Sequence, residues 1–363
     1  MKRALAVGTA LLASVSLAGA ARASVPSWRL GYVGERMCNA LPDSAAKLAC
    51  YQTQRNLMAG PRSWVWQLTQ QIRATLQAGR SAPLTVRQAY ANEVLATLRP
   101  YFYGHPFSHG ATPRGSPGLR FYDDNAWVGM VFLMAYRQSG LRALLYAAEG
   151  VMRFEFTGEW RSSDPARNHY DPGGIYWTTH RHQRPLTANA GATNLALQLY
   201  LVTRKRAYLA FAKRDYRWLR ETLRNPNGLY RQFEGFYGKT RGFGAVNGQA
   251  MVAGDAAMLS HITHSTAYLG QSRQVAEATW RHYGPMLQHI KPVYTSQAFY
   301  FLPRSSMLAN RATLNAYANW LVQHMSRGKL LLPFGNRTVT PTSQAGATGV
   351  LVMRLRTDHV RHR

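Results

Sequence analysis

The sequence predicts an all-α fold in which helical hairpins repeat and pack together as a toroid. Three observations carry this prediction. After residue 61 almost no segment alternates as a strand does, and Gly, Pro and Asn separate apolar stretches of helical length. Two successive hairpins also match at an offset of 64 residues. Hairpins that cannot bury an apolar face alone must stack on neighbours, which is compatible with a closed ring or an open solenoid.

The first 23 residues are expected to be an export signal. Met-Lys-Arg precedes a weakly apolar run over residues 4–20 and a small-residue end, which is typical of a secretory signal cleaved after Ala23. The alternative is a membrane anchor, but the many Ala, Gly and Ser residues make this run a poor permanent span. No later stretch is long and apolar enough to cross a bilayer. The mature chain is therefore predicted to be secreted or periplasmic, without a transmembrane segment.

Residues 24–60 are interpreted as an N-terminal extension. They contain both cysteines of the chain, Cys38 and Cys50. Export makes an oxidising compartment the expected environment, so we predict a local disulfide, with two buried free thiols as the alternative. The main domain is expected over residues 61–355, followed by a basic tail at 356–363.

The matching hairpins predict which helices lie inside. Residues 126–138 and 190–202 are apolar on most of their circumference, whereas 142–154 and 206–220 are amphipathic, as inner and outer helices would be. The matched pairs are Asn125 with Asn189, Ala126 with Ala190, Tyr136 with Tyr200, Leu145 with Leu209, and Ala148 with Ala212. A third unit is expected from Asn247, with helices at about 249–262 and 275–287. An earlier unit would comprise 64–76 and 86–98, and a later one would begin near Arg311.

The chain is strongly basic, with 44 Lys and Arg residues against 16 Asp and Glu and a formal net charge of +28. Such a surface attracts polyanions, so an electrostatic association with an acidic cell envelope is one expectation. The basic residues are spread along the chain without a dense block or a nucleic-acid motif, so no specific nucleic-acid partner is predicted. A solvated basic surface explains the charge equally well.

Asp123 and Asp124 are the only acidic residues that are neighbours in the sequence. Two carboxylates held close together cannot both ionise at their ordinary pKa values, so one stays protonated beside an ionised partner. Glycosidases need this division between an attacking carboxylate and a proton donor. Consecutive Cα atoms lie about 3.8 Å apart, so a carboxyl separation of about 5 to 5.5 Å is reachable, which predicts retention of configuration.

The same residues have a structural interpretation. Asp-Asp-Asn immediately before an apolar helix supplies N-cap and first-turn residues that satisfy free amide groups and suit the helix dipole. The surrounding Phe121, Tyr122 and Trp127 offer flat faces on which a sugar ring can stack, although aromatic residues at such spacing are more often part of a core. Capping and catalysis therefore both remain open from the local pattern.

No metal and no organic cofactor are predicted. The closest histidine pairs lack a carboxylate at ligand spacing and do not have the form His-Glu-x-x-His; they are His105 and His109, His180 and His182, and His261 and His264. The glycine-rich residues 242–248 lack a preceding strand and the spacing of a dinucleotide fingerprint.

Several segments, in order, resemble glycoside hydrolase family 76, the endo-α-1,6-mannanases. Phe121 to Trp127 with the nine residues after it resemble the start of the family's catalytic helix, and residues 173–177 resemble its Gly-Gly-Ile-Trp-Trp loop. Residues 184–189 are similar to its Lys-Asn-x-x-Ser-Asn stretch, and 225–230 to the loop that ends the next hairpin. The resemblance covers about residues 61–355 and is clearest over 119–255.

This resemblance implies an (α/α)6 barrel and a retaining endo-α-1,6-mannosidase that acts on α-mannan or a related polysaccharide. By position, Asp123 would be the nucleophile and Asp124 the general acid and base. The residues implied to bind substrate are Tyr122, Trp127, Tyr176, Trp177, Asn189 and Asn247. Departures from the family pattern at 246–249 and 296–304 bear on which glycan binds. The competing functions are a glycan transglycosylase that uses the same pair and a non-catalytic toroid that binds envelope polyanions.

Overall fold

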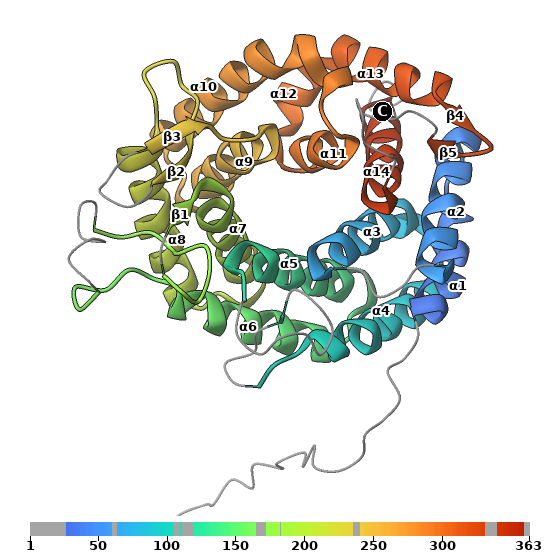
Figure 1. Cartoon of the computed structure of the whole chain (residues 1–363), viewed down its shortest axis with the longest axis horizontal. Coiled ribbons are helices and arrows are strands. Elements are labelled where there is room, and N and C mark those ends of the chain that lie inside the picture. Colours follow the sequence, from blue (N-terminus) through green and yellow to red (C-terminus); the bar gives the residue numbers. More distant parts are fainter. Residues whose placement is uncertain are drawn as a thin grey trace, which may run out of the picture.

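A computed structural model describes residues 27–59, 64–104, 109–110, 120–164, 172–181, 183–234, 240–330 and 340–358. Over these residues the chain forms two concentric rings of helices (Figure 1). The inner ring comprises α3 (Val65–Ala78), α5 (Tyr122–Ser139), α7 (Leu186–Thr203), α9 (Val246–Thr263), α11 (Pro292–Phe301) and α14 (Pro341–Asp358). Each inner helix packs against the next, and α14 packs against α3. The ring is therefore closed, which confirms the all-α toroid and rules out the open solenoid.

The outer ring surrounds these helices. It comprises α1 (Ser27–Cys38), α2 (Ser44–Ala59), α4 (Leu84–Leu98), α6 (Arg142–Thr157), α8 (Arg206–Trp218), α10 (Thr266–Tyr283), α12 (Arg304–Ala309) and α13 (Arg311–Gln323). Short helical turns extend the inner helix α3 and the outer helices α4, α8 and α10: η1 (Gly79–Ser81), η2 (Arg99–Tyr101), the π-helical η4 (Leu219–Leu223) and η6 (Gly284–His289), in that order.

The burial pattern explains why each helix takes its layer. In α7 every residue from Ala188 to Leu199 is buried, because the inner ring on both sides and the outer ring behind it enclose the helix. In α8 the buried residues recur at helical spacing and include Tyr208, Phe211 and Asp215, so one face packs inward while the other faces solvent. The predicted division into apolar inner and amphipathic outer helices is confirmed.

The repeat offset holds for two units and then changes. Helices α5 and α7 both contain 18 residues and start 64 residues apart, at 122 and 186. Helix α9 starts at 246, which is 60 residues after α7, and α10 starts at 266 rather than near 275. The expected unit near Arg311 is corrected, because α13 starts there and is an outer helix. The sequence does not predict its inner partner α11, because this helix has only ten residues and contains the run Tyr-Thr-Ser-Gln in its middle.

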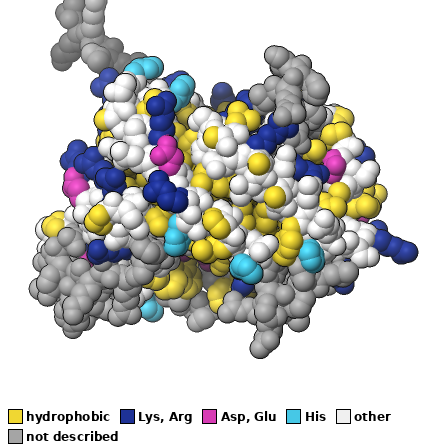
Figure 2. Space-filling view, turned by 90° about the horizontal axis from the view of Figure 1, so that it is seen from above, with side chains coloured by type: hydrophobic (Ala, Val, Ile, Leu, Met, Phe, Trp, Pro, Cys, Tyr) yellow, Lys and Arg dark blue, Asp and Glu magenta, His cyan; other side chains and the backbone are white. Residues whose placement is uncertain are grey.

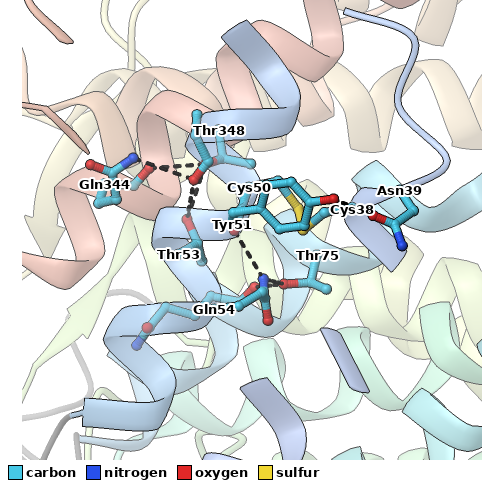
Figure 3. Close-up of a disulfide and its surroundings, with 11 residues drawn as sticks. Cys38, Asn39, Cys50, Tyr51, Thr53, Gln54, Thr75, Gln344 and Thr348 are labelled. Atoms are coloured by element: carbon cyan, nitrogen blue, oxygen red, sulfur yellow. Dashed lines mark hydrogen bonds between the residues drawn. A yellow bond between two sulfur atoms is a disulfide. The ribbon is translucent and has the colours of Figure 1, made fainter. Parts of the chain in front are cut away.

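The N-terminal helices belong to the barrel. Helices α1 and α2 pack on each other and on α4, α3 and α14, so the described part of the N-terminal extension, residues 27–59, contributes to the outer ring. Cys38 and Cys50 form the predicted disulfide between them. Figure 3 shows how α2 is tied to the inner ring: Gln54 donates to Thr75 of α3 at 2.8 Å, and the hydroxyls of Thr53 and Thr348 of α14 lie 3.0 Å apart.

Short strands lie in the loops between the rings. In the three-stranded antiparallel sheet, β2 (Arg231–Glu234) pairs with both β1 (Arg184–Pro185) and β3 (Thr240–Phe243), and a second pair joins β4 (Met325–Ser326) to β5 (Lys329–Leu330). Because β1 leads directly into α7, this sheet lies at the N-terminal end of the inner helices.

Some predictions fall outside the described residues: the export signal at 1–23, His105, His182 and the end of the basic tail at 359–363. In the described part of the chain, none of the helices has the length and apolar character that a membrane span requires.

Candidate active site

A cleft opens where the first turns of the inner helices meet. Its central pocket of about 240 Å³ is lined by the second residues of α3, α5, α7 and α9, which are Trp66, Asp123, Thr187 and Asn247. The remaining lining residues are Asp124, Trp127, Trp177, Pro185, Gln232, Phe233, Ala245 and Tyr294. The closed ring therefore brings residues that are far apart in sequence to one site.

A second pocket of about 290 Å³ continues the cleft across the two aspartates. It shares Trp66, Asp123, Asp124 and Trp177 with the central pocket and adds Trp64, Gln67 and Phe121. The carboxyl groups thus lie between a polar side formed by Thr187, Gln232 and Asn247 and an aromatic side formed by Trp64, Trp66 and Phe121.

Three donors orient the Asp123 carboxyl. The indole N–H of Trp177 lies 3.2 Å from both Oδ1 and Oδ2, and the Thr187 hydroxyl donates to Oδ2 at 3.3 Å. The backbone N–H of Asp124 donates to Oδ1 at 3.0 Å. These hydrogen bonds favour the ionised form of Asp123.

The two carboxyl groups have different protonation behaviour. Burial raises the pKa of Asp123 to about 6, and the three donors limit this rise. Burial, together with the negative charge of Asp123, raises the pKa of Asp124 well above its ordinary value. Asp123 is therefore the more readily ionised of the two and Asp124 the more readily protonated, which is the division that a retaining glycosidase requires of its nucleophile and its acid.

The N-cap of α5 is neither aspartate. Phe121 occupies that position with an extended backbone and makes no side-chain capping bond. Asp123 and Asp124 are the second and third residues of the helix, so they lie favourably for the helix dipole while the Asp123 carboxylate accepts from Trp177 and Thr187. Helix capping alone therefore does not explain why an aspartate occupies position 123.

Trp177 and Trp127 line the cleft, as their interpretation as sugar-binding residues requires. Trp177 packs edge-on against Phe121. Trp127 is buried, and the guanidinium of Arg73 lies 5.8 Å from its ring centroid. Arg73 itself is buried and donates to Gln70 and to the hydroxyl of Ser296. These contacts hold Trp127 in place in the lining of the cleft.

Three residues predicted to bind substrate do not line the cleft. Tyr122 is buried behind the aspartates, where it stacks on Phe154. Tyr176 is fully buried, and its hydroxyl donates to Asp164 at 3.1 Å. Asn189 is fully buried in α7 and bonds only to backbone groups. Their placement makes them supports of the site, because side chains adjacent in sequence to cleft residues point away from the cleft.

Asn189 belongs to a recurring clamp. Its Oδ1 accepts from the backbone N–H of Ile175 at 2.6 Å, and its Nδ2 donates to the Ile175 carbonyl at 3.0 Å. Asn125 binds both backbone groups of His109 in the same way, and Gln249 binds those of Tyr230. Each clamp is the fourth residue of an inner helix and fixes one loop residue at the cleft end.

The clamps correct the predicted alignment of the third unit. The equivalent of Asn125 and Asn189 is Gln249, whereas Asn247 lies two residues earlier, in the position of Asp123 and Thr187. Asn247 lines the cleft, and its Oδ1 has no hydrogen-bond partner among the described residues.

Sequence reasoning missed several cleft residues. The 64-residue offset from Asp123 points directly to Thr187, so that signal was present in the repeat. No periodic signal identifies Trp66, Tyr294 or Phe233, because Trp66 and Tyr294 reach the cleft only through closure of the ring by α3 and α11, and Phe233 lies in the short strand β2. Over the described residues, no group of three His, Cys, Asp or Glu side chains is arranged to hold a metal ion.

Comparison with known proteins points to one enzyme family. The sequence model described as "Glycosyl hydrolase family 76" matches residues 87–351. An α-mannanase of that family from Bacteroides thetaiotaomicron superposes with a TM-score of 0.69 at 16% identity, covering 83% of this chain and 88% of that chain. No curated protein matches the chain by sequence.

Two further solved structures share the fold. One is an inactive variant of an α-1,6-mannanase from Salegentibacter sp. HEL1_6, with two adjacent aspartates replaced by asparagine, in complex with α-1,6-mannotriose. It has a TM-score of 0.63 at 15% identity and covers 91% of this chain and 99% of that chain. The other is cellobiose 2-epimerase from Bacillus thermoamylovorans, with a TM-score of 0.61 at 8% identity, covering 81% and 89%. At these identities the likeness shows the fold alone, and the chemistry must be read from the residues of the cleft.

Proposed function

Because the chain belongs to glycosyl hydrolase family 76, and is thus a glycoside hydrolase with a polysaccharide substrate, we propose that it is a retaining endo-α-1,6-mannosidase. In this proposal Asp123 attacks the anomeric carbon and forms a glycosyl-enzyme, while Asp124 protonates the departing oxygen. Asp124 then removes a proton from water, which releases the product with its configuration retained.

The unequal environment of the two carboxyl groups carries this proposal. Asp123 receives the hydrogen bonds that favour a carboxylate, whereas burial and the neighbouring charge keep Asp124 protonated. The reverse assignment would leave the hydrogen-bonded group protonated and the group beside it charged, which is less favourable on both counts.

The lining of the cleft supports an uncharged α-glycan as the substrate. Apart from the two aspartates, its described lining contains no charged side chain, although the chain carries a net charge of +28. Trp66 and Trp177 supply flat apolar faces, and Asn247 supplies an acceptor that has no partner among the described residues. The relative from Salegentibacter, which binds α-1,6-mannotriose, supports mannan as the specific choice.

The shape of the cleft supports internal cleavage. Its pockets extend to both sides of the aspartates, toward Asn247 and Gln232 on one side and toward Trp64 on the other. A polysaccharide can therefore lie across the carboxyl groups with sugar units on either side of the cleaved bond. The Cys38–Cys50 disulfide supports our further proposal that the enzyme works in a secreted or periplasmic setting.

Incubation of the purified protein with α-1,6-mannan, other α-mannans and bacterial exopolysaccharides tests the proposal. Mass analysis should detect manno-oligosaccharides of several lengths early in the reaction, as internal cleavage produces. Release of mannose alone would refute endo action, and products longer than the starting oligosaccharides would identify a transglycosylase that uses the same aspartates. Inactivity on every α-mannan would contradict the proposed substrate.

A further inference from the structure

A second depression lies on the outside of the barrel, between η6 and α13. It has a volume of about 410 Å³ and is lined by Gly284, Pro285, Leu287, Gln288, Thr313, Ala316, Tyr317, Asn319, Trp320 and Gln323. We refer to these residues as the α13 groove. Since Thr313 and Gln323 lie ten residues apart on one helix, the groove follows α13 for about 15 Å.

The groove is uncharged on a strongly basic protein. No Lys, Arg, Asp or Glu occurs among its described lining residues or between residues 312 and 323 of α13. By contrast, α8 alone contains Arg206, Lys213, Arg214 and Arg217. In Figure 2, which is seen from the side of α10, α12 and α13, the middle of the face carries mostly uncharged side chains while Lys and Arg gather toward its edges. A charged group that does reach the lining, Arg354, donates to Asn319 at 3.0 Å and is itself paired with Asp43 at 3.6 Å.

The lining combines an aromatic base with an amide rim. Tyr317 is buried and stacks with the half-buried Trp320, their planes differing by 13°. Gln288, Asn319 and Gln323 are exposed around them, and each carries an amide, which both donates and accepts hydrogen bonds. The Asn319 oxygen already accepts one from Arg354. This arrangement suits a sugar, because the C–H face of the ring packs on aromatic carbon while its hydroxyls exchange hydrogen bonds with amides.

The α13 groove has the residue types of the active-site cleft without its acids. The cleft also combines Trp and Tyr with Gln, Asn and Thr, and differs in containing Asp123 and Asp124. Five residues of the chain separate Gln288 in the groove from Tyr294 in the cleft. Gln288 and Tyr294 therefore lie at most about 20 Å apart, within reach of one long polymer.

We propose that the α13 groove is a second, non-catalytic binding site for the uncharged polysaccharide that the cleft cleaves. The inference rests on the proposed function for its ligand. Its role would be to hold the polymer close to the cleft, so that a chain bound at one place rebinds quickly at the other. Short oligosaccharides, which cannot span both places, would gain nothing from it.

Two matched substitutions on α13 test this role. Ala316 and Ala312 are both exposed on the helix, one turn apart, but only Ala316 lines the groove. Ala316→Glu places a long charged side chain in the groove, whereas Ala312→Glu adds the same charge outside it. A second variant, Gln288→Ala with Gln323→Ala, removes two exposed amides of the rim without filling the groove.

Binding is measured by depletion onto insoluble α-mannan, with Asp123→Asn present in every variant so that no polymer is cleaved. Ala316→Glu should bind about tenfold more weakly than Ala312→Glu, and the double alanine variant should bind more weakly than the parent. In the active enzyme, Ala316→Glu should lower the rate on dilute mannan and leave kcat/KM on α-1,6-mannotetraose unchanged. Equal mannan binding by Ala316→Glu and Ala312→Glu would overturn the proposal.

Other results separate this proposal from the proposed function. A wild-type dimer that only Ala316→Glu dissociates in sedimentation would assign the groove to self-association and overturn the glycan site. If the wild-type enzyme cleaves no mannan, the proposed function fails. Binding of the same variants to dextran and glycogen then tests whether the groove binds an uncharged glycan. Selective loss of that binding in Ala316→Glu would support a site for uncharged glycans, and wild-type binding to none of the polymers would overturn it.

Discussion

The first turns of α5 and α7 have the same construction but different chemistry. Each helix has a carboxamide in its fourth position, Asn125 or Asn189, that holds both backbone groups of one loop residue. Each also directs its second residue into the cleft, but that residue is Asp123 in α5 and Thr187 in α7. The third residue is Asp124 in one and Ala188 in the other.

This difference shows which residues of the repeat support the structure and which ones bear on the reaction. The clamps and the ring direct the second side chain of each inner helix into the cleft, so α5 and α7 share the same architecture. The reaction depends on what stands there, and only α5 carries the acids. Thr187 has instead become a donor to Asp123, at 3.3 Å. The repeat thus supplies equivalent positions, which the sequence has filled with the proposed nucleophile Asp123, with its hydrogen-bond donor Thr187 and, in α9, with the amide of Asn247.

Removing the charge of Asp123 should have the largest effect on activity, because no residue of α7 replaces it. Asp123→Asn keeps the size of the side chain but cannot attack the anomeric carbon, so kcat should fall by about 10⁴-fold or more. Steady-state kinetics on α-1,6-mannotetraose measures this loss, and thermal unfolding should show a folded protein. Thr187→Asp in the same variant should restore nothing, because a carboxylate on α7 lies in a different position relative to Asp124 than one on α5 does. Recovery of activity there would show that the two first turns are interchangeable.

Trp177 should matter through the pKa of Asp123. Trp177→Phe keeps a ring in the cleft but removes the indole N–H that bonds both carboxylate oxygens, so the pKa of Asp123 should rise above about 6. Activity of the wild type should increase as pH rises through about 6, because Asp123 must be ionised, and decrease at higher pH when Asp124 loses its proton. The variant should shift the acidic limb to higher pH and lower kcat by about tenfold. An unchanged acidic limb would remove Trp177 from this role.

Loss of the α7 clamp should have a smaller effect on catalysis than loss of Trp177. Asn189→Ala leaves the backbone groups of Ile175 without their partner, two residues before Trp177, at a cost of about 1 to 3 kcal/mol in stability. The loosened loop should shift the acidic limb in the same direction as Trp177→Phe. Gln249→Ala provides the control, since it removes the clamp of α9, which holds Tyr230. A similar loss of stability without the pH shift is expected there, and equal pH profiles in both variants would contradict this positioning role.

The smallest effect is expected from the hydroxyl of Thr187. Thr187→Val keeps the shape of the side chain and removes one of three donors to Asp123, so kcat should fall only a few-fold, equivalent to about 1 kcal/mol. Kinetics at several pH values checks this, and a loss as large as that of Asp123→Asn would mean that Thr187 itself takes part in the reaction.

Much of the fold was predictable because its signals are local. Apolar residues around the whole circumference of α5 and α7, and on one face of α8, identified the layers. The same local pattern failed at α11, which is short and polar in its middle, and at the N-terminus, where α1 and α2 look separate in sequence but close the outer ring.

The site was predictable where the chemistry is local and unpredictable where it depends on ring closure. The adjacent Asp123 and Asp124 were evident in an acid-poor chain. The direction of each side chain was not, so Tyr122 and Tyr176 were expected in the cleft although they point away from it. Gln249 escaped because a Gln, longer by one methylene, fills the role of Asn125 and Asn189, and the repeat is four residues shorter there.

Azide rescue tests most directly whether Asp123 attacks and Asp124 donates. The substrate is an aryl α-1,6-mannobioside, whose leaving group departs without protonation, and NMR gives the configuration of the mannobiosyl azide formed. With Asp124→Ala, azide should displace Asp123 from the glycosyl-enzyme and yield the α-azide. With Asp123→Gly, azide should attack the substrate directly and yield the β-azide. The opposite pair of configurations would reverse the two roles, and the β-azide from both variants would contradict a covalent intermediate on either aspartate.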